Sequence, residues 1–247
     1  MHSVNAAPVQ SQAMPVLRIL TAAPMLPALR TLAPGFEQAN GLKLQLDVAP
    51  VTGKGAASVG QHLADRASAD VIVTTDFAMA KLQARGQIVA QSRVDVGRSF
   101  IAMAVGQGAS KPDIHNVEAF KQALLASDSI GYTGSASGLY LSRVLFVRMG
   151  LTAAFQRKTH LLTAIALAEG ITSGRVQLGF QELSELKAVP GIDIVGLIPD
   201  ALQQMTLYSA AVSETGAHRD TAQAFVDYLA SPQGREAIVA SGLQLAR

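Results

Sequence analysis

The stretch Ala69-Asp70-Val71-Ile72-Val73-Thr74-Thr75-Asp76 decides the fold of this chain. Five consecutive β-branched residues between two aspartates are typical of a short strand that is buried on both faces, as in parallel sheets. The next segment, Phe77 to Arg85, has the composition of a helix and ends at Gly86, a residue type that commonly terminates helices. A buried strand that leads directly into a helix predicts an α/β protein.

The segment before this strand has the same pattern. Val16 to Leu20 predicts a strand, and Ala28 to Asn40 predicts an amphipathic helix that stops at Gly41. Leu42 to Val48 alternates with period two and predicts the next strand. A helix from about Ser58 to Arg66 completes the connection to the buried strand. The first part of the chain is therefore expected to form strand, helix and parallel strand units.

A second α/β set follows the strand predicted at Phe100 to Val105, and the polar stretch Gly106 to Pro112 predicts a crossing into a second lobe. The elements expected there are helices at Val117–Ala126, Leu139–Met149 and Ala164–Glu169, and strands at Ser129–Tyr132 and Val176–Phe180. The segment Ile192 to Val195 follows them. Leu207 to Val212 mirrors the outgoing strand. The last predicted elements are helices at Ala222–Leu229 and Gly234–Ser241. We predict one lobe at residues 15–104 and 208–247 and another at residues 105–207.

Composition excludes several classes of function. The chain has 247 residues, 49% hydrophobic and 15% charged, which is typical of a globular protein. Its 20 Lys and Arg residues and 18 Asp and Glu residues are scattered, so a nucleic-acid partner is not expected. The absence of cysteine excludes disulfides, thiolate zinc sites and a cysteine nucleophile. No apolar run reaches about 18 residues, so no membrane insertion is expected.

The first residues predict export. Val4 and Ala6 are small residues at the spacing that signal peptidase accepts before its cleavage point. We interpret residues 1–14 as the disordered remnant of a truncated leader and expect a periplasmic protein. A disordered cytoplasmic tail is the alternative interpretation.

Several short motifs occur in an order that is shared with a known family. The motifs are Leu20-Thr21-Ala22-Ala23, Ser68-Ala69-Asp70-Val71 with Thr75-Asp76, Ala136-Ser137-Gly138-Leu139-Tyr140, Leu178-Gly179-Phe180, and Ala224 to Gly234. From Leu17 to about Leu243 the chain thus resembles the type II periplasmic binding proteins, in detail their molybdate-binding branch. The resemblance implies an α/β fold of two lobes, each a mixed sheet flanked by helices, joined by two hinge crossings.

That family holds an anion between its lobes, and the resemblance implies the same here. Backbone N–H groups at helix starts and a few hydroxyls bind the anion, because the first turn of a helix has unpaired donors and a partial positive charge. The corresponding helix starts are Ala23 to Leu26, Ser137 to Leu139 and Thr163 to Ile165. The implied binding residues are Ala23, Pro24, Met25, Thr75, Ser137, Gly138, Tyr140, Ala164, Gln181, Thr206 and Tyr208.

Three features depart from the molybdate pattern. Pro24 stands where the molybdate binders have a serine, and Glu182 stands where they have a tyrosine. The loop that contains Gly53-Lys54-Gly55 is several residues longer. A carboxylate repels a dianionic oxide in a semi-enclosed cleft. The pocket is therefore predicted to suit a larger anion with several carboxylates, toward which Lys54 can reach.

The segments Gly179 to Leu186 and Pro190 to Asp193 are similar to an enzymatic sub-branch, the aconitate isomerases. This resemblance implies an isomerase of a small tricarboxylate that interconverts its trans and cis forms by an allylic 1,3-proton shift in the cleft. The reaction needs one base and donors that stabilise a dienolate, and it requires neither a metal nor an organic cofactor. We assign Glu182 as the base and Lys54 as a catalytic donor. A solvated carboxylate in a first helical turn is the other interpretation of Glu182.

His160 and His218 are other conceivable bases, although both fit ordinary surface histidines. The alternative function is a periplasmic solute-binding component of an ABC importer for molybdate or a small organic anion. The expected partner is a small anionic tricarboxylate, and a membrane permease is expected only under that alternative.

Overall fold

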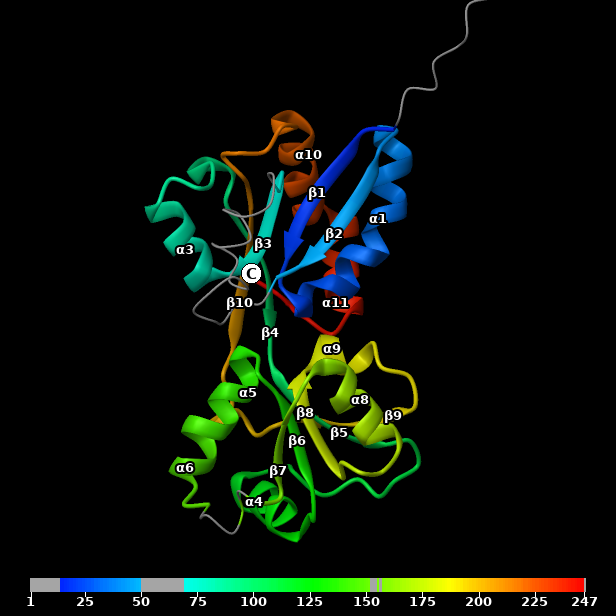
Figure 1. Ribbon diagram of the computed structural model, residues 1–247, viewed down its shortest axis with the longest axis vertical. Helices are drawn as coiled ribbons and strands as arrows, with labels where there is room; N and C mark the ends of the chain where they lie inside the picture. Colours follow the sequence, from blue (N-terminus) through cyan, green and yellow to red (C-terminus); the bar gives the residue numbers. More distant parts are fainter. Residues whose placement is uncertain (1–13, 50–68, 152–154, 156, 247) are drawn as a thin grey trace, which may run out of the picture.

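A computed structural model of the chain describes residues 14–49, 69–151, 155 and 157–246. These residues form two mixed sheets, one in each of two lobes that lie one above the other along the longest axis (Figure 1). The predicted fold class, a two-lobed α/β protein with mixed sheets and flanking helices, is confirmed. Within the described ranges, no helix has the length and apolar character needed to cross a membrane.

The sheet of the first lobe has the strand order β11-β4-β10-β3-β1-β2. β1 lies between β2 and β3 and is parallel to both, whereas β10 is antiparallel to β3 and β4. The strand bounds are β1 Val16–Thr21, β2 Lys43–Val48, β3 Val71–Thr75, β4 Val94–Ser99, β10 Thr206–Val212 and β11 Gln244–Leu245.

Helices cover both faces of this sheet, with α3 on the side opposite α1 in Figure 1. The bounds are η1 Ala23–Met25, α1 Leu26–Asn40, α3 Asp76–Ala84, η2 Ala90–Ser92, α10 Arg219–Ala230 and α11 Pro232–Ala240. β3 serves both layers: Val71 and Val73 pack in the cluster with α1 and α10, and Ile72 packs with α3. This is why the deciding stretch is apolar on both faces.

The sheet of the second lobe has the order β7-β6-β8-β5-β9. Its strands are β5 Ile101–Gly106, β6 Ile130–Thr133, β7 Thr159–Leu162, β8 Leu178–Glu182 and β9 Ile192–Leu197. Its helices are α4 Val117–Ala126, α5 Ala136–Tyr140, the π-helical turn η3 Leu141–Leu145, α6 Phe146–Arg148, α8 Ala164–Thr172, α9 Leu183–Lys187 and the turn η4 Asp200–Leu202. β6 and β8 are parallel, so their carboxyl ends meet at one edge of the sheet.

The chain crosses between the lobes at Phe100, between β4 and β5, and again between β9 and β10. The sequence placed the first crossing between residues 104 and 105. Ile101 to Ala104 pair instead with β8 and β9 in the second sheet. The strand predicted at Phe100 to Val105 corresponds to β5, and β4, which ends two residues before β5 begins, was not predicted. No Gly or Pro marks the boundary between these two strands. The predicted division into two domains, residues 15–104 with 208–247 and residues 105–207, stays a proposal. The strand pairing moves its first boundary from residue 104 to Phe100.

The strands β4, β7 and β11, the helix α9 and the turns η2 and η4 were not predicted. The helix expected at Leu139–Met149 begins at Ala136 and includes the π-helical turn. The helix expected at Ser58–Arg66, the lysine loop and the proposed leader remnant, apart from Met14, lie outside the described residues.

Candidate functional site

A cavity of about 310 Å³ lies between the lobes, where the carboxyl ends of strands from both sheets meet. The first lobe contributes Ala23, Pro24, Val48, Ala49, Thr75 and Tyr208 to its wall. The second lobe contributes Thr133, Gly134, Ser135, Ala136, Ala164, Gln181, Glu182 and Glu185. No Lys, Arg or His occurs among the described residues of this wall.

Helices α3, α5 and α8 begin at this cavity, each directly after a strand. Thr75, Ser135 and Thr163 are their N-caps, and each hydroxyl accepts a hydrogen bond from a backbone N–H three residues later. The distances are 3.3 Å from Ala78 N, 3.4 Å from Gly138 N and 3.2 Å from Ala166 N. The other first-turn N–H groups have no partner within their helices, which suits the site to an anion.

Glu182 is the last residue of β8 and the N-cap of α9, and it is 2% exposed. The Tyr208 hydroxyl from the first lobe lies 3.1 Å from Glu182 Oε1 and 3.0 Å from Oε2, and donates to this carboxylate. Burial raises the pKa of Glu182 to about 7, while the neighbouring hydroxyls of Ser99 and Tyr208 act in the opposite direction. Ser99 Oγ makes no hydrogen bond of regular geometry with any described residue. Glu182 therefore titrates near neutral pH.

Glu185 lies three residues later, in the first turn of α9, and also lines the cavity. Gln181 Nε2 donates to Glu185 Oε1 at 2.6 Å. Glu185 Oε2 is buried and has no hydrogen-bond partner among the described residues. Burial, and secondly the charge of Glu182, raise the pKa of Glu185 to about 8. The two carboxyls thus form a coupled pair in the wall of the cavity.

Burial also raises the pKa of the Tyr208 hydroxyl well above 10, and the nearby carboxylates add to the effect. Tyr208 is therefore a neutral hydrogen-bond donor over the whole range in which the glutamates titrate.

Seven of the predicted site residues line the cavity: Ala23, Pro24, Thr75, Ala164, Gln181, Glu182 and Tyr208. Lys54 lies outside the described residues. The other five, Met25, Ser137, Gly138, Tyr140 and Thr206, do not belong to the wall.

Packing explains these five positions. Met25 is fully buried in the core of the first lobe, and the Tyr140 hydroxyl donates to the Leu202 carbonyl at 3.0 Å. Ser137 is buried behind the wall, with its hydroxyl 2.9 Å from that of Ser135. Gly138 packs on β6, where a Cβ atom would lie 1.8 Å from the Thr133 carbonyl oxygen. Thr206 begins β10, opposite Ser99.

Sequence reasoning missed Val48, Ala49, Thr133, Gly134, Ser135, Ala136 and Glu185. Two of these left a signal. Ser135 precedes a helical segment, but the helix start was placed two residues too late, at Ser137. Glu185 follows Glu182 at the spacing that brings two side chains to one helix face.

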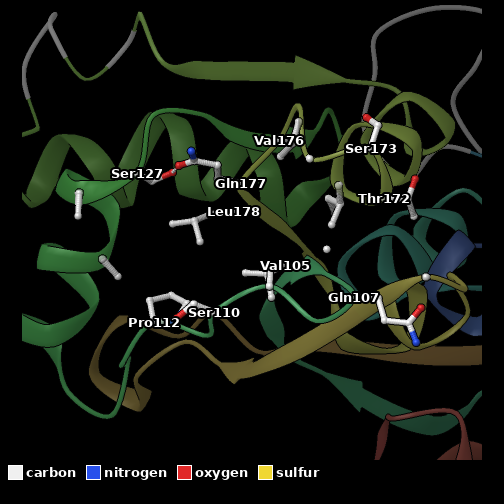
Figure 2. A pocket seen from close by; sticks show the side chains of 17 residues that line it. Val105, Gln107, Ser110, Pro112, Ser127, Thr172, Ser173, Val176, Gln177 and Leu178 are labelled. Atoms are coloured by element: carbon white, nitrogen blue, oxygen red, sulfur yellow. Dashed lines mark hydrogen bonds between the residues drawn. The ribbon is translucent and has the colours of Figure 1, made fainter.

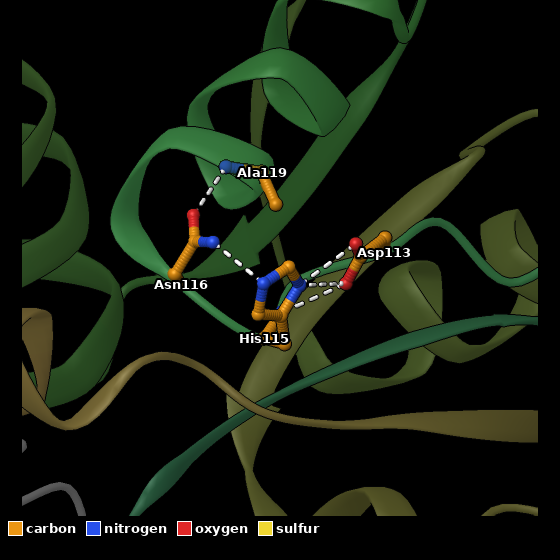
Figure 3. Close-up of polar contacts among 4 residues, drawn as sticks. All are labelled: Asp113, His115, Asn116 and Ala119. Atoms are coloured by element: carbon orange, nitrogen blue, oxygen red, sulfur yellow. Dashed lines mark hydrogen bonds and ion pairs between the residues drawn. The ribbon is translucent and has the colours of Figure 1, made fainter.

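The three histidines that the structure describes lie away from this cavity. His160 is exposed on β7, and His218 lines a separate surface pocket with Asp70 and Arg18. His115 is exposed before α4, where its Nδ1 lies 2.7 Å from Asp113 Oδ1 and its Nε2 lies 2.6 Å from Asn116 Nδ2 (Figure 3). None of these three lines the interlobe cavity.

A larger hollow of about 970 Å³ lies in the second lobe (Figure 2). Its wall includes Leu178, at the start of β8, and Val105, near the end of β5. Because Glu182 ends β8 at the interlobe cavity, this hollow lies at the opposite end of the sheet. No charged side chain lines it within the described residues, so it lacks the groups for acid and base chemistry.

Two mixed sheets with a cavity between them, walled by helix starts, form the two-lobed fold of periplasmic binding proteins. The chain matches the family described as bacterial extracellular solute-binding protein over residues 17–244, and it belongs to that family. At a finer level, it is 47% identical over 234 residues to aconitate isomerase from Pseudomonas sp, covering 95% of this chain and 89% of that relative. The resemblance drawn from the sequence motifs is confirmed at both levels.

Solved structures support the fold. The periplasmic molybdate-binding protein of Azotobacter vinelandii superposes with a TM-score of 0.74 at 18% identity, over 94% of this chain and 100% of that one. PEB3 with bound L-phospholactate superposes with a TM-score of 0.65 at 13% identity, over 92% of this chain and 99% of that one. At these identities the likeness is one of architecture.

Proposed function

We propose that this chain is an aconitate isomerase that interconverts trans- and cis-aconitate in the interlobe cavity. The observation that carries the proposal is the 47% identity to an aconitate isomerase over nearly the whole of both chains. The site adds a physical reason: Glu182 is a buried carboxyl in the cavity wall with a pKa of about 7, which suits a general base at neutral pH.

The proposed reaction is a 1,3-proton shift. Aconitate has a central carbon that bears a carboxylate, flanked by a CH₂ and a double-bonded CH, each of which also bears a carboxylate. Glu182 removes a proton from the CH₂, and the electron pair delocalises through the allylic system into a carboxylate as a dienolate. A proton then adds to the other terminal carbon. The double bond has moved by one position, and no cofactor is consumed.

The helix starts have the second role. N–H groups in the first turns of α3, α5 and α8, with the hydroxyls of Thr75 and Ser135, hold the substrate carboxylates and the charge of the dienolate. The Thr75 hydroxyl accepts from its own helix and keeps its proton for the ligand. The Ser135 hydroxyl also lies 2.9 Å from the hydroxyls of Thr133 and Ser137, so these three hydroxyls share their protons. Lys54, from the loop outside the described residues, is proposed to supply a full positive charge.

The two buried carboxyls, Glu182 and Glu185, argue against the alternative function, a molybdate-binding protein. A tetrahedral dianion presents oxygen in every direction, so one oxygen would face Glu182 and be repelled. Pro24 stands in the wall and has neither a hydroxyl nor a backbone N–H to offer. Aconitate concentrates its charge on three separated groups and can present C–H bonds to Glu182. The geometry thus favours a carbon acid as ligand.

The substrate class proposed here is a small tricarboxylate, and the proposed location is the periplasm, in line with the extracellular family to which the chain belongs. A permease partner would be needed only if the chain delivered its ligand to an importer.

The test is to incubate the purified protein with trans-aconitate and to follow cis-aconitate by proton NMR, with Glu182→Gln alongside. We expect conversion by the wild-type protein and a loss in kcat of roughly 100-fold or more in Glu182→Gln, the range typical of general acid and base catalysis. Calorimetric titration with molybdate is the control. Absent conversion together with tight molybdate binding would reverse the assignment in favour of a receptor.

A further inference from the structure

The side chain of Glu185 has a feature that a single-base reaction leaves unused. Its Oε2 atom is buried without a hydrogen-bond partner among the described residues, although Glu185 lines the cavity. Buried polar oxygens almost always have a partner, and an exception requires a reason. A buried carboxyl oxygen without a donor favours the protonated form of the group, so Glu185 is suited to hold a proton beside the cavity.

The second feature is the closeness of Glu185 to Glu182. The two residues are three apart, at the end of β8 and in the first turn of α9, so their side chains share one face. No described cation of the wall separates or neutralises them. Two carboxyls in such a site do not both ionise readily, and they share one proton across neutral pH.

The hydrogen bonds divide the roles within the pair. Tyr208 donates to both oxygens of Glu182, which favours the ionised form of that carboxyl. Glu185 receives one bond, from Gln181 to Oε1, and Oε2 is left open. No described donor therefore stabilises a negative charge on Oε2, so Glu185 favours its protonated form. Glu182 is thus the better base and Glu185 the better acid.

Building on the isomerase function proposed above, we propose that Glu185 is a second catalytic residue, which protonates one terminal carbon of aconitate after Glu182 has deprotonated the other. Glu182 gains the proton that the CH₂ loses, and the C–H electron pair enters the allylic system. The other terminal carbon forms its new C–H bond with the proton of Glu185, which becomes a carboxylate. A proton transfer from Glu182 to Glu185, directly or through water, restores the starting pair.

This relay makes a prediction about the origin of the hydrogen. In D₂O the shared proton of the pair is replaced by deuterium before substrate binds. The first turnover of unlabelled trans-aconitate then yields cis-aconitate with one deuterium at the newly formed C–H position. A single base that carries the same proton from one carbon to the other would instead leave the new position with hydrogen. Rapid-quench NMR or mass spectrometry separates the two, and retained hydrogen overturns the relay.

The variant Glu185→Gln provides the second test, because it keeps the shape of the side chain and removes the acid. We expect isomerisation to fall by roughly 100-fold or more. Glu182 still removes and returns a proton at the same carbon, so hydrogen–deuterium exchange at the CH₂ of trans-aconitate should stay within about tenfold of wild type. Near-normal isomerisation in this variant contradicts the proposal, and so does the loss of exchange together with isomerisation.

Controls separate catalysis from folding and from the function itself. Glu169→Gln changes an exposed glutamate on α8 and should leave both rates unchanged. Glu185→Asp keeps an acid and should recover at least tenfold of the isomerisation lost in Glu185→Gln. If Glu185→Gln does not fold, the isotope pattern of the wild-type protein decides alone. A wild-type protein without any conversion refutes the isomerase proposal itself, whereas wild-type conversion with active Glu185→Gln refutes only the role of Glu185.

Discussion

At the residue scale, Glu182 shows two local effects in opposition. As the N-cap of α9 it sits at the positive end of a helix, and Tyr208 donates to it, so both features favour its ionised form. Burial opposes them and is the larger effect, since the pKa of Glu182 rises to about 7. The result is a carboxyl that binds and releases a proton near neutral pH, as a base in an isomerase must.

The pH dependence of the reaction follows from the pair. Glu182 must be ionised and Glu185 protonated, with pKa values of about 7 and about 8, so kcat/KM should be bell-shaped with its maximum between these values. Within the described part of the chain, the side chains that act on the pair are Ser99, Tyr208 and Gln181, and none of these three carries a charge in this range. Initial rates from about pH 5 to pH 10 test this. In Glu185→Gln the decrease of kcat/KM at alkaline pH should disappear. If the decrease is unchanged, a group other than Glu185 causes it.

Burial of Glu182 also has a consequence for stability. Its pKa is near 4.5 in the unfolded chain and about 7 in the folded protein, so the folded state binds the proton more tightly. The contribution of Glu182 to stability should therefore fall as pH rises from about 4.5 to about 7 and change little above this range. Glu182→Gln avoids this loss and should be more stable than wild type by about 3 kcal/mol at pH 8, with no gain at pH 4. Urea unfolding of both proteins at both pH values measures the difference. Equal stability of wild type and Glu182→Gln at pH 8 would show that burial does not raise the pKa of Glu182.

At the element scale, the proposal assigns substrate binding to the helix starts, and N-capping residues can be tested against one another. Ser135 caps α5 at the cavity, whereas Asn116 caps α4 by accepting from Ala119 N at 2.8 Å, far from the cavity wall (Figure 3). Replacing either by alanine should destabilise the protein by about 1 kcal/mol. Only Ser135→Ala should also raise KM for aconitate, by about tenfold, because it removes a hydroxyl from the cavity wall and with it a polar contact to the substrate. Equal KM values in the two variants would exclude a binding role for Ser135.

The sequence predicted elements well where one physical signal was strong. β3 is apolar on both faces and α4 has clear helical periodicity, and both were placed within one residue of their observed bounds. β4 was missed because Val94 to Ser99 contains Asp, Gly, Arg and Ser, and its pairing with β10 outweighs that weak strand propensity. α9 was missed because it has only five residues, too few to show a period.

Residues of the candidate site could be predicted where a family motif fixed their place in the sequence. They were harder to predict where two neighbouring residues of similar chemistry differ only in which one faces the cavity. Glu182 and Tyr208 lie in the wall as expected, although their mutual hydrogen bond joins residues from different lobes and leaves no local sequence pattern. Ser137 and Ser135 are both small hydroxyl residues near a helix start, and only the observed N-cap shows that Ser135 faces the cavity. The burial that sets the pKa of Glu185 likewise depends on the assembled fold.

At the scale of the whole molecule, α9 links the two lobes. Ser184 Oγ, on this helix of the second lobe, donates to the Pro24 carbonyl of the first lobe at 2.8 Å. Lys187 Nζ donates to the Ala240 carbonyl at 3.0 Å, and α9 lies beside the end of α11 in Figure 1. Together with the Tyr208–Glu182 contact, these bonds fix the width of the cavity beside the two glutamates. A fixed distance between base and donors is what catalysis requires.

The central claim is that this two-lobed fold catalyses a reversible proton shift on aconitate. The most direct measurement starts two reactions with the purified protein, one from pure trans-aconitate and one from pure cis-aconitate, and follows both by NMR. The account predicts that both reactions reach the same final mixture at rates proportional to protein concentration, and that Glu182→Gln slows both alike. Two mixtures that stay at their starting composition while the protein binds aconitate would contradict it and leave a binding protein without catalysis.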